Sequence, residues 1–102
     1  MHNKVEITGR LGSNVTARIL PSGDEVTSFT VIVERPEKER VGSTKVDTIP
    51  CQTFRVSVAS KVSGLDAGTV VTAQGVLRRR FWKVPSGLGS AMEVEVRSLK
   101  RA

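Results

Sequence analysis

The 102-residue sequence lacks residues on which several protein classes depend: it has one cysteine, one histidine and no tyrosine. A single cysteine, Cys51, cannot form an internal disulfide, so a disulfide scaffold is excluded and a reducing compartment such as the cytoplasm is expected. The longest apolar run is residues 31–33. A membrane helix needs about 20 apolar residues and a signal peptide needs an apolar core of its own. The sequence therefore predicts neither, and no membrane partner.

Patterns for catalysis and metal binding are missing as well. The only histidine, His2, is terminal, so a Ser–His or Cys–His arrangement would have to use that terminal side chain. Cys51 has no second cysteine or neighbouring histidine, which predicts a buried apolar role. Glu93 and Glu95 share a strand face and are expected to offset arginines of a neighbouring strand. With no glycine-rich phosphate loop either, we expect no enzyme, no metal and no cofactor.

Valine, threonine and isoleucine together exceed a quarter of the chain, and such β-branched residues favour strands. Turn-forming residues separate strand-like segments at 4–11, up to about 20, 26–33, 46–58, 69–83 and beyond the turn at 85–87. Residues 59–66 are the one short helix expected, residues 34–45 form an exposed loop, and Pro50 marks an edge or a bulge. We predict one all-β domain over residues 1–102, a small barrel of about five strands with one short helix, although other small all-β folds share this pattern.

The strongest local signal is residues 78–83, R-R-R-F-W-K, which carry four positive charges and half of the aromatic residues. In a regular strand Arg78, Arg80 and Trp82 share one face. That face suits single-stranded nucleic acid, because arginine neutralises phosphates and an indole stacks on an unpaired base. The alternative is a solvated charged edge on which Trp82 covers the end of the core. The net charge of +6 is concentrated here and in residues 97–102, while the rest of the chain is nearly neutral.

Three segments of the chain resemble bacterial single-stranded DNA-binding proteins. Residues 1–12, M-H-N-K-V-E-I-T-G-R-L-G, look like the first strand of that family, and residues 21–33 look like its second hairpin. Residues 68–82, G-T-V-V-T-A-Q-G-V-L-R-R-R-F-W, resemble its strand ending in G-x-L-R-x-R-x-W. The resemblance implies a five-stranded oligonucleotide-binding (OB) barrel in the bacterial cytoplasm or nucleoid. It also implies binding of single strands without sequence preference in replication, recombination or repair.

The resemblance further assigns binding residues by position. Trp82 matches a tryptophan that stacks on a base, and Phe54, in C-Q-T-F-R, matches a second stacking aromatic. Phosphate-binding positions of the family fall on Lys4, Arg18, Arg78 and Arg80. Four basic residues match by region only, on a loop that in the family reaches along the strand: Arg35, Lys38, Arg40 and Lys45. Phe29 alternates with valines and is expected in the core.

Two features of the family are missing from this sequence. Glu37 and Thr48 occupy approximately the positions of two further stacking tryptophans, which predicts a weaker stacking surface than the family norm. The acidic-tipped tail that recruits repair and replication proteins is expected to be absent, because the sequence stops at Ala102. These departures favour the DNA-binding module over the recruiting role.

Two functions from different classes fit this pattern. The first is sequence-independent binding of single-stranded DNA. The alternative is an OB-fold protein-interaction adaptor of the replication-restart primosome type, whose basic segment would serve a partner's acidic tail as much as DNA. The resemblance also implies that residues 3–11 pair across a two-fold axis, so that a homo-oligomer, either a dimer or a tetramer, is expected.

Overall fold

Strands account for most of the backbone, as the abundance of β-branched residues predicts. The computed structural model describes residues 1–102 and contains six strands: β1 (Val5–Leu11), β2 (Thr16–Ile19), β3 (Glu25–Glu34), β4 (Val46–Thr53), β5 (Val70–Val84) and β6 (Gly87–Arg101). A 3-10 turn, η1 (Glu37–Glu39), follows β3, and helix α1 (Val56–Gly64) lies between β4 and β5. Five of these strands close the barrel, as expected, and the strand-like segment ending near residue 20 pairs with β3 as an additional strand, β2.

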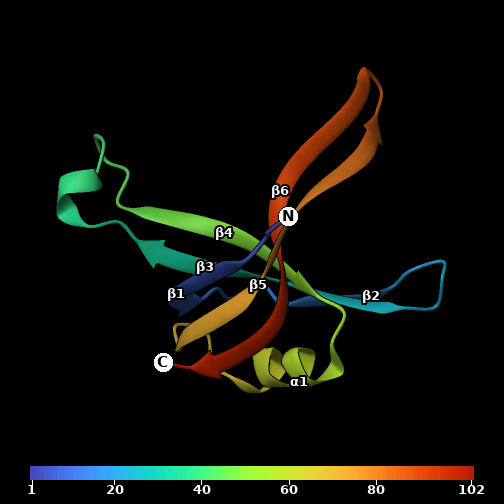
Figure 1. Cartoon of the computed structure of the whole chain (residues 1–102), viewed down its shortest axis with the longest axis horizontal. Coiled ribbons are helices and arrows are strands. Elements are labelled where there is room, and N and C mark those ends of the chain that lie inside the picture. Colours follow the sequence, from blue (N-terminus) through green and yellow to red (C-terminus); the bar gives the residue numbers. More distant parts are fainter.

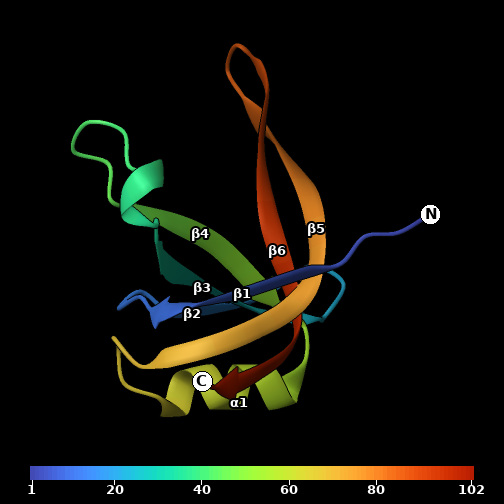
Figure 2. The same cartoon turned by 60° about the vertical axis from the view of Figure 1, so that its left-hand side comes forward.

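The strands form one sheet in the order β1-β5-β6-β4-β3-β2, and a further pairing of β1 with β3 closes it into a barrel. Strand β1 runs antiparallel to β5 along Val5–Arg10 but meets β3 only at Arg10 and Leu11. Strands β4 and β6 share a short parallel contact just after Pro50, and before it β4 pairs only with β3, which confirms the predicted edge position. Figure 2 shows the resulting curl of the sheet above α1.

The barrel interior is filled mainly by valines. Eleven buried residues form one cluster: Leu11, Phe29, Val31, Cys51, Val58, Val62, Val71, Ala73, Val94, Val96 and Leu99. Phe29 and Cys51 are therefore buried, as predicted. Burial and the nearby negative charge of Glu93 raise the pKa of the Cys51 thiol to about 12, so the thiol stays neutral and packs as an apolar group. Each fully buried valine or leucine contributes about 1.5–3 kcal/mol to the free energy of folding. This cluster therefore stabilises the barrel from which the loop and the hairpins project.

The largest difference from the predicted elements follows β4. A strand was expected over 46–58 and a helix over 59–66, but the strand ends at Thr53 and α1 begins three residues later. The Thr53 hydroxyl donates to a β6 carbonyl (2.8 Å) and accepts a bond from the backbone N–H two residues on (3.1 Å), which turns the chain out of the sheet. Val58 and Val62, four residues apart, then lie on one buried helix face. None of the helices in the structure has the length and apolarity that crossing a membrane requires.

Three segments project from the barrel in Figure 1: the loop 35–45, the β2–β3 hairpin, and the outer part of the β5–β6 hairpin, residues 77–93, which we call the arm. The arm leaves the barrel at a register shift between Gln74 and Gly75. A side-chain carbon at Gly75 would overlap the backbone of Glu95. Glycine is therefore needed for this close approach of β5 to β6, and the irregularity bends the hairpin where the arm begins.

Candidate nucleic-acid interface

Strand register decides which side chains of the arm share a face. Val84 pairs with Gly87 across a turn at residues 85–86, as predicted, and the pairing runs without a shift down to Arg78 opposite Glu93. Directly paired residues project to the same side of a two-stranded sheet. One side, which we call the tryptophan face, therefore holds Arg78, Arg80, Trp82, Gly89, Ala91 and Glu93. The predicted grouping of the two arginines with the indole is confirmed.

The Trp82 indole lies against the backbone of the facing strand. Its cross-strand partner is Gly89, where an added Cβ would stand 2.5 Å from the indole Cε2. The Arg80 guanidinium carbon lies 5.3 Å from the ring centroid, within the range of a cation–π contact. Trp82 nevertheless remains 42% exposed. The indole is thus supported by Gly89 and Arg80 and still open to solvent, which is the condition for stacking on a base.

The two arginines of the tryptophan face are already paired with carboxylates. Arg80 Nε lies 3.5 Å from Glu93 Oε1, and Arg78 Nε lies 3.6 Å from Glu95 Oε1. Glu95 also accepts a bond from Arg97 Nη2 at 3.3 Å. Glu93 is only 7% exposed and its Oε1 has no hydrogen-bond donor, so the charge of Arg80 compensates this buried carboxylate. The predicted offset of these arginines by Glu93 and Glu95 is confirmed, and a phosphate would compete with both carboxylates.

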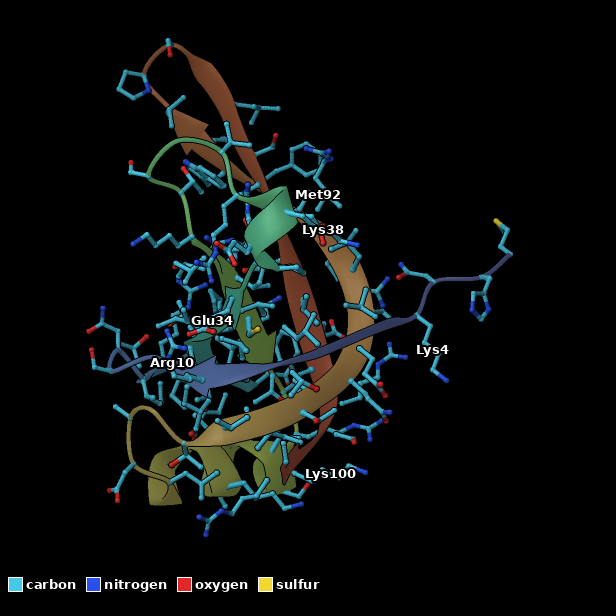
Figure 3. The ribbon with its side chains drawn as sticks, turned by 90° about the vertical axis from the view of Figure 1, so that its left-hand side faces the viewer. Lys4, Arg10, Glu34, Lys38, Met92 and Lys100 are labelled. Atoms are coloured by element: carbon cyan, nitrogen blue, oxygen red, sulfur yellow. The ribbon has the colours of Figure 1, made fainter.

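Lys4 lies just before β1, next to the base of the arm. Asn3 fixes this position, because its Nδ2 donates to the Leu77 carbonyl (2.9 Å) and its Oδ1 accepts from the Leu77 N–H (2.8 Å). Lys4 has no ion-pair partner, and Figure 3 shows its side chain pointing into solvent. The sequence-predicted Lys4 therefore adds a free positive charge beside the arm.

Phe54, Arg18 and the second basic segment lie away from the arm. Phe54 is 45% exposed and borders a hollow of about 490 Å³ between α1 and the β2–β3 hairpin, the hairpin on which Arg18 is exposed. Lys100 and Arg101 line a different hollow against α1, at the end of the molecule opposite the arm. The structure therefore spreads the predicted contacts over the barrel instead of gathering them at Trp82.

The loop 35–45 holds its basic residues in different states. Arg35 makes a two-pronged ion pair with Asp47: Nη2 to Oδ1 is 2.7 Å and Nε to Oδ2 is 3.0 Å. The hydrogen bonds from Arg35 lower the pKa of the Asp47 carboxyl, and the same contact raises the pKa of Arg35. Arg40 Nε donates to the Arg35 carbonyl at 3.2 Å. Lys38 and Lys45 are exposed without an ion-pair partner, so they are the freer charges of this loop.

Sequence reasoning missed two residues that shape the tryptophan face and its surroundings. Gly89 supports the indole, and it could have been found by counting back from a two-residue turn at 85–86, which sets Trp82 opposite Gly89. Asp47 ties down Arg35, and no short-range pattern reveals this contact, because it depends on the pairing of β3 with β4.

Comparisons with known proteins agree with this geometry. The model of the family described as "Single-strand binding protein family" matches residues 2–101. Single-stranded DNA-binding protein 3 of Listeria innocua is 30% identical over 87 residues, which cover 85% of this chain and 54% of that protein. Single-stranded DNA-binding protein A of Bacillus subtilis is also 30% identical over 87 residues, with 85% and 51% covered. The chain spans about half the length of these curated relatives.

A solved structure shares the fold. The Plasmodium falciparum SSB complex with ssDNA superposes with a TM-score of 0.78 at 23% sequence identity, covering 100% of this chain and 96% of that chain. The predicted OB fold is thereby confirmed.

Proposed function

This chain belongs to the single-strand binding protein family, and on that premise we propose that it binds single-stranded DNA without sequence preference, by base stacking and phosphate neutralisation. Its setting would be DNA replication, recombination or repair. The relatives that it matches carry single-stranded DNA binding in their names, and the fold-sharing structure is a complex with single-stranded DNA.

One observation carries the proposal: Trp82 stands exposed on the arm, held against Gly89 and beside Arg80. An indole fixed before binding loses little side-chain freedom when a base stacks on it, and base–aromatic stacking contributes about 1–3 kcal/mol per base. Because every base has a flat π-face, such a contact does not select sequence.

A fluorescence titration tests the proposal, since Trp82 is the only tryptophan. Addition of oligo-dT should quench the emission, and rising salt should weaken binding steeply as counterions are restored to the strand. With a labelled oligonucleotide read by anisotropy, Trp82→Ala should bind about 1–3 kcal/mol more weakly at an unchanged salt slope. Equal affinity for duplex DNA, or unchanged emission at saturating oligo-dT, would contradict the stacking role.

The remaining basic and aromatic positions extend the proposed path of the strand. We assign phosphate contacts and one further stacking contact to residues spread over the barrel: Lys4, Arg18, Arg35, Lys38, Arg40, Lys45 and Phe54. Lys4, Lys38 and Lys45 are exposed without ion pairs, which supports their availability. For Arg35 a phosphate must displace or share the Asp47 contact.

Assembly through β1 is part of the proposal. Along Val5–Gly9 this strand has β5 as its only neighbour, so its other edge offers unpaired backbone groups that a second copy can pair with. Size-exclusion chromatography with light scattering should give a multiple of 11.0 kDa. Thr8→Lys, which places a charge on this open edge, should lower that mass, because charged side chains on an edge strand oppose its pairing with a second strand. A monomeric wild-type protein would reject this assembly.

The alternative function, an OB-fold protein-interaction adaptor, predicts different affinities in binding assays of the same kind. Tight binding of an acidic peptide together with feeble binding of oligo-dT would favour an interaction module over a DNA-binding one. The exposed tryptophan face supports the DNA-binding reading, because a stacking surface serves bases directly.

A further inference from the structure

The arm has a second face, opposite the tryptophan face, to which the proposed function assigns no role. Its members are the residues that alternate with Arg78, Arg80 and Trp82 on β5, together with their cross-strand partners on β6. We call this set the phenylalanine face: Leu77, Arg79, Phe81, Lys83, Leu88, Ser90 and Met92. Phe81 is 60% exposed and Leu88 is 71% exposed, and Leu77 and Met92 are exposed as well.

The phenylalanine face continues the core-facing side of the barrel. On β6, Val96 and Val94 are buried and Met92 is the next residue of the same row; on β5, Leu77 pairs with Val94 and so shares that side. Figure 2 shows the outer part of the β5–β6 hairpin standing clear of the other strands. The apolar side chains of this row are therefore exposed there. A contiguous exposed apolar surface of this kind marks an interaction site.

Charge distinguishes the two faces of the arm. On the tryptophan face, Arg78 and Arg80 are each within 3.6 Å of a carboxylate oxygen. On the phenylalanine face there is no acidic residue, Arg79 is bonded only to the Ser90 hydroxyl (3.2 Å), and Lys83 has no ion-pair partner. Two uncompensated cations therefore flank Phe81, whereas the arginines around Trp82 are largely offset.

We propose that the phenylalanine face is a second contact surface for single-stranded DNA, on which Phe81 stacks a base while Arg79 and Lys83 neutralise phosphates. Leu88 and Met92 supply apolar surface beside the stacked base. An exposed aromatic ring between free cations is the combination that sequence-tolerant binding of single strands uses. This inference rests on the proposed function. It adds residues that belong neither to the tryptophan face nor to the binding positions implied by the family resemblance.

Charge complementarity selects this occupant over a second copy of the chain. Two phenylalanine faces brought together would oppose the cations Arg79 and Lys83 to their own copies, with no carboxylate to compensate them. A polyanion with exposed flat apolar bases satisfies the cations and the apolar side chains at once.

A tryptophan exchange tests the proposal directly. The double variant Phe81→Trp/Trp82→Phe moves the only fluorophore to the phenylalanine face and keeps an aromatic ring on each face. Oligo-dT should quench its emission, and Phe81→Ala in the wild-type background should bind labelled oligo-dT about 5- to 150-fold more weakly. If the exchanged variant binds labelled oligo-dT but its emission does not change at saturation, the phenylalanine face is not a contact surface and the proposal is overturned.

Charge variants provide a second readout. Arg79→Gln/Lys83→Gln should lower the salt slope by about 1.4, since each neutralised phosphate contributes about 0.7 for single strands. The matched pair Arg78→Gln/Arg80→Gln removes the same net charge and should lower the slope less, because those cations are already offset. An equal or larger loss for the matched pair overturns the proposal.

The outcomes separate this proposal from the function on which it rests. If wild-type protein quenches with oligo-dT while the phenylalanine-face variants bind like wild type, only the second surface is rejected. If wild-type protein binds no oligo-dT, the proposed function fails and this inference fails with it. Loss of an oligomer in Phe81→Ala, with DNA binding intact, would identify the face as an interface between copies and equally reject the proposal.

Discussion

Strands β5 and β6 each have one half in the barrel and one half in the arm. One row of side chains runs through both halves and has a different role in each. In the barrel half the row holds Val71, Val94 and Val96, which are buried; in the arm half it holds Phe81 and Leu88, which are exposed. The alternation is continuous from Val71 to Phe81 on β5 and from Val96 to Leu88 on β6. What differs is whether other strands and α1 cover it.

Because the row is covered in the barrel and exposed in the arm, its side chains stabilise the fold in one half of the hairpin and are available for binding in the other. Apolar groups covered by the barrel contribute to the free energy of folding, whereas the same kind of group on the arm is free to contribute to a ligand. Substitutions in the two halves should therefore be separable, with barrel variants losing stability and arm variants losing affinity for DNA.

The largest effect is expected from truncating the same residue type in both halves of β6. Leu99 is 2% exposed and Leu88 is 71% exposed. Leu99→Ala should lower the free energy of unfolding by about 2–5 kcal/mol, because it removes buried apolar surface and leaves a cavity. Leu88→Ala should change it by less than about 0.5 kcal/mol. Urea denaturation followed by circular dichroism measures both, and equal losses would show that the arm is packed against something in solution.

The next effect lies at the junction of the two halves. Gly75→Ala places a Cβ against the backbone of Glu95, which cannot swing aside as a side chain can. We expect a loss of about 1–3 kcal/mol from the forced shift of β5 against β6. Gly64→Ala is the control, since a Cβ there meets nothing within 4 Å, and it should be neutral or slightly stabilising. A neutral Gly75→Ala would mean that the close approach is not required.

Sequence alone predicted the parts of this architecture that depend on local alternation. The strands around Val31 and Val94 and the turns near 21–24 and 85–86 follow from side-chain period and turn residues. The loop does too, although it begins at Arg35, one residue later than expected. The predicted start of α1 was wrong because the sequence fits both periods here. Val56 and Val58 fit the two-residue period of a strand, while Val58 and Val62 fit the period of a helix. Deciding between them needs the Thr53 hydrogen bonds, which are contacts with β6.

The candidate site shows the same limit. The tryptophan face was predicted because Arg78, Arg80 and Trp82 alternate within one strand. The difference in charge between the two faces of the arm was only partly predictable. Glu93 and Glu95 were recognised as partners of arginines, but the free state of Arg79 and Lys83 on the phenylalanine face became visible only with the register of the arm. Contacts within one hairpin can be counted from its turn, as for Trp82 and Gly89, but contacts between strands that no short turn joins, such as that of Thr53 with β6, need a pairing that a single sequence does not supply.

A smaller effect should come from disturbing the support under Trp82. Gly89→Ala puts a Cβ 2.5 Å from the indole, and the side chain must move to make room. Stability should stay within about 1 kcal/mol of wild type, since alanine suits a strand better than glycine does. Affinity for oligo-dT should fall by about 2- to 10-fold, because a freed indole must be ordered again on binding. The tryptophan emission of the free protein should shift to longer wavelength; an unshifted spectrum with unchanged affinity would rule out the supporting role of Gly89.

The smallest effects concern the Arg35–Asp47 pair, at the base of the loop 35–45. Contact with Arg35 lowers the pKa of Asp47, so the pair stabilises the fold above the ordinary aspartate pKa of about 4. That stabilisation disappears as the pH falls through the lowered pKa. The free energy of unfolding of wild type should therefore exceed that of Asp47→Asn at neutral pH, and the two should converge in acid. A difference that does not shrink as the pH is lowered would have another origin.

Asp47→Asn also tests how the Asp47 carboxylate affects DNA binding by the loop. The arginines of the tryptophan face are paired with carboxylates, and the cations of the phenylalanine face are not. If Arg35 binds a phosphate once it is released, the variant should bind oligo-dT more tightly and its salt slope should steepen by about 0.7. Asp66→Asn, which removes an equal charge at an exposed position after α1, is the control for general attraction. Equal gains in the two variants would mean that Arg35 holds the loop through Asp47 without touching DNA. A gain confined to Asp47→Asn would mean that a phosphate competes with an intramolecular carboxylate at the loop, which is the competition we expect from Glu93 and Glu95 on the arm.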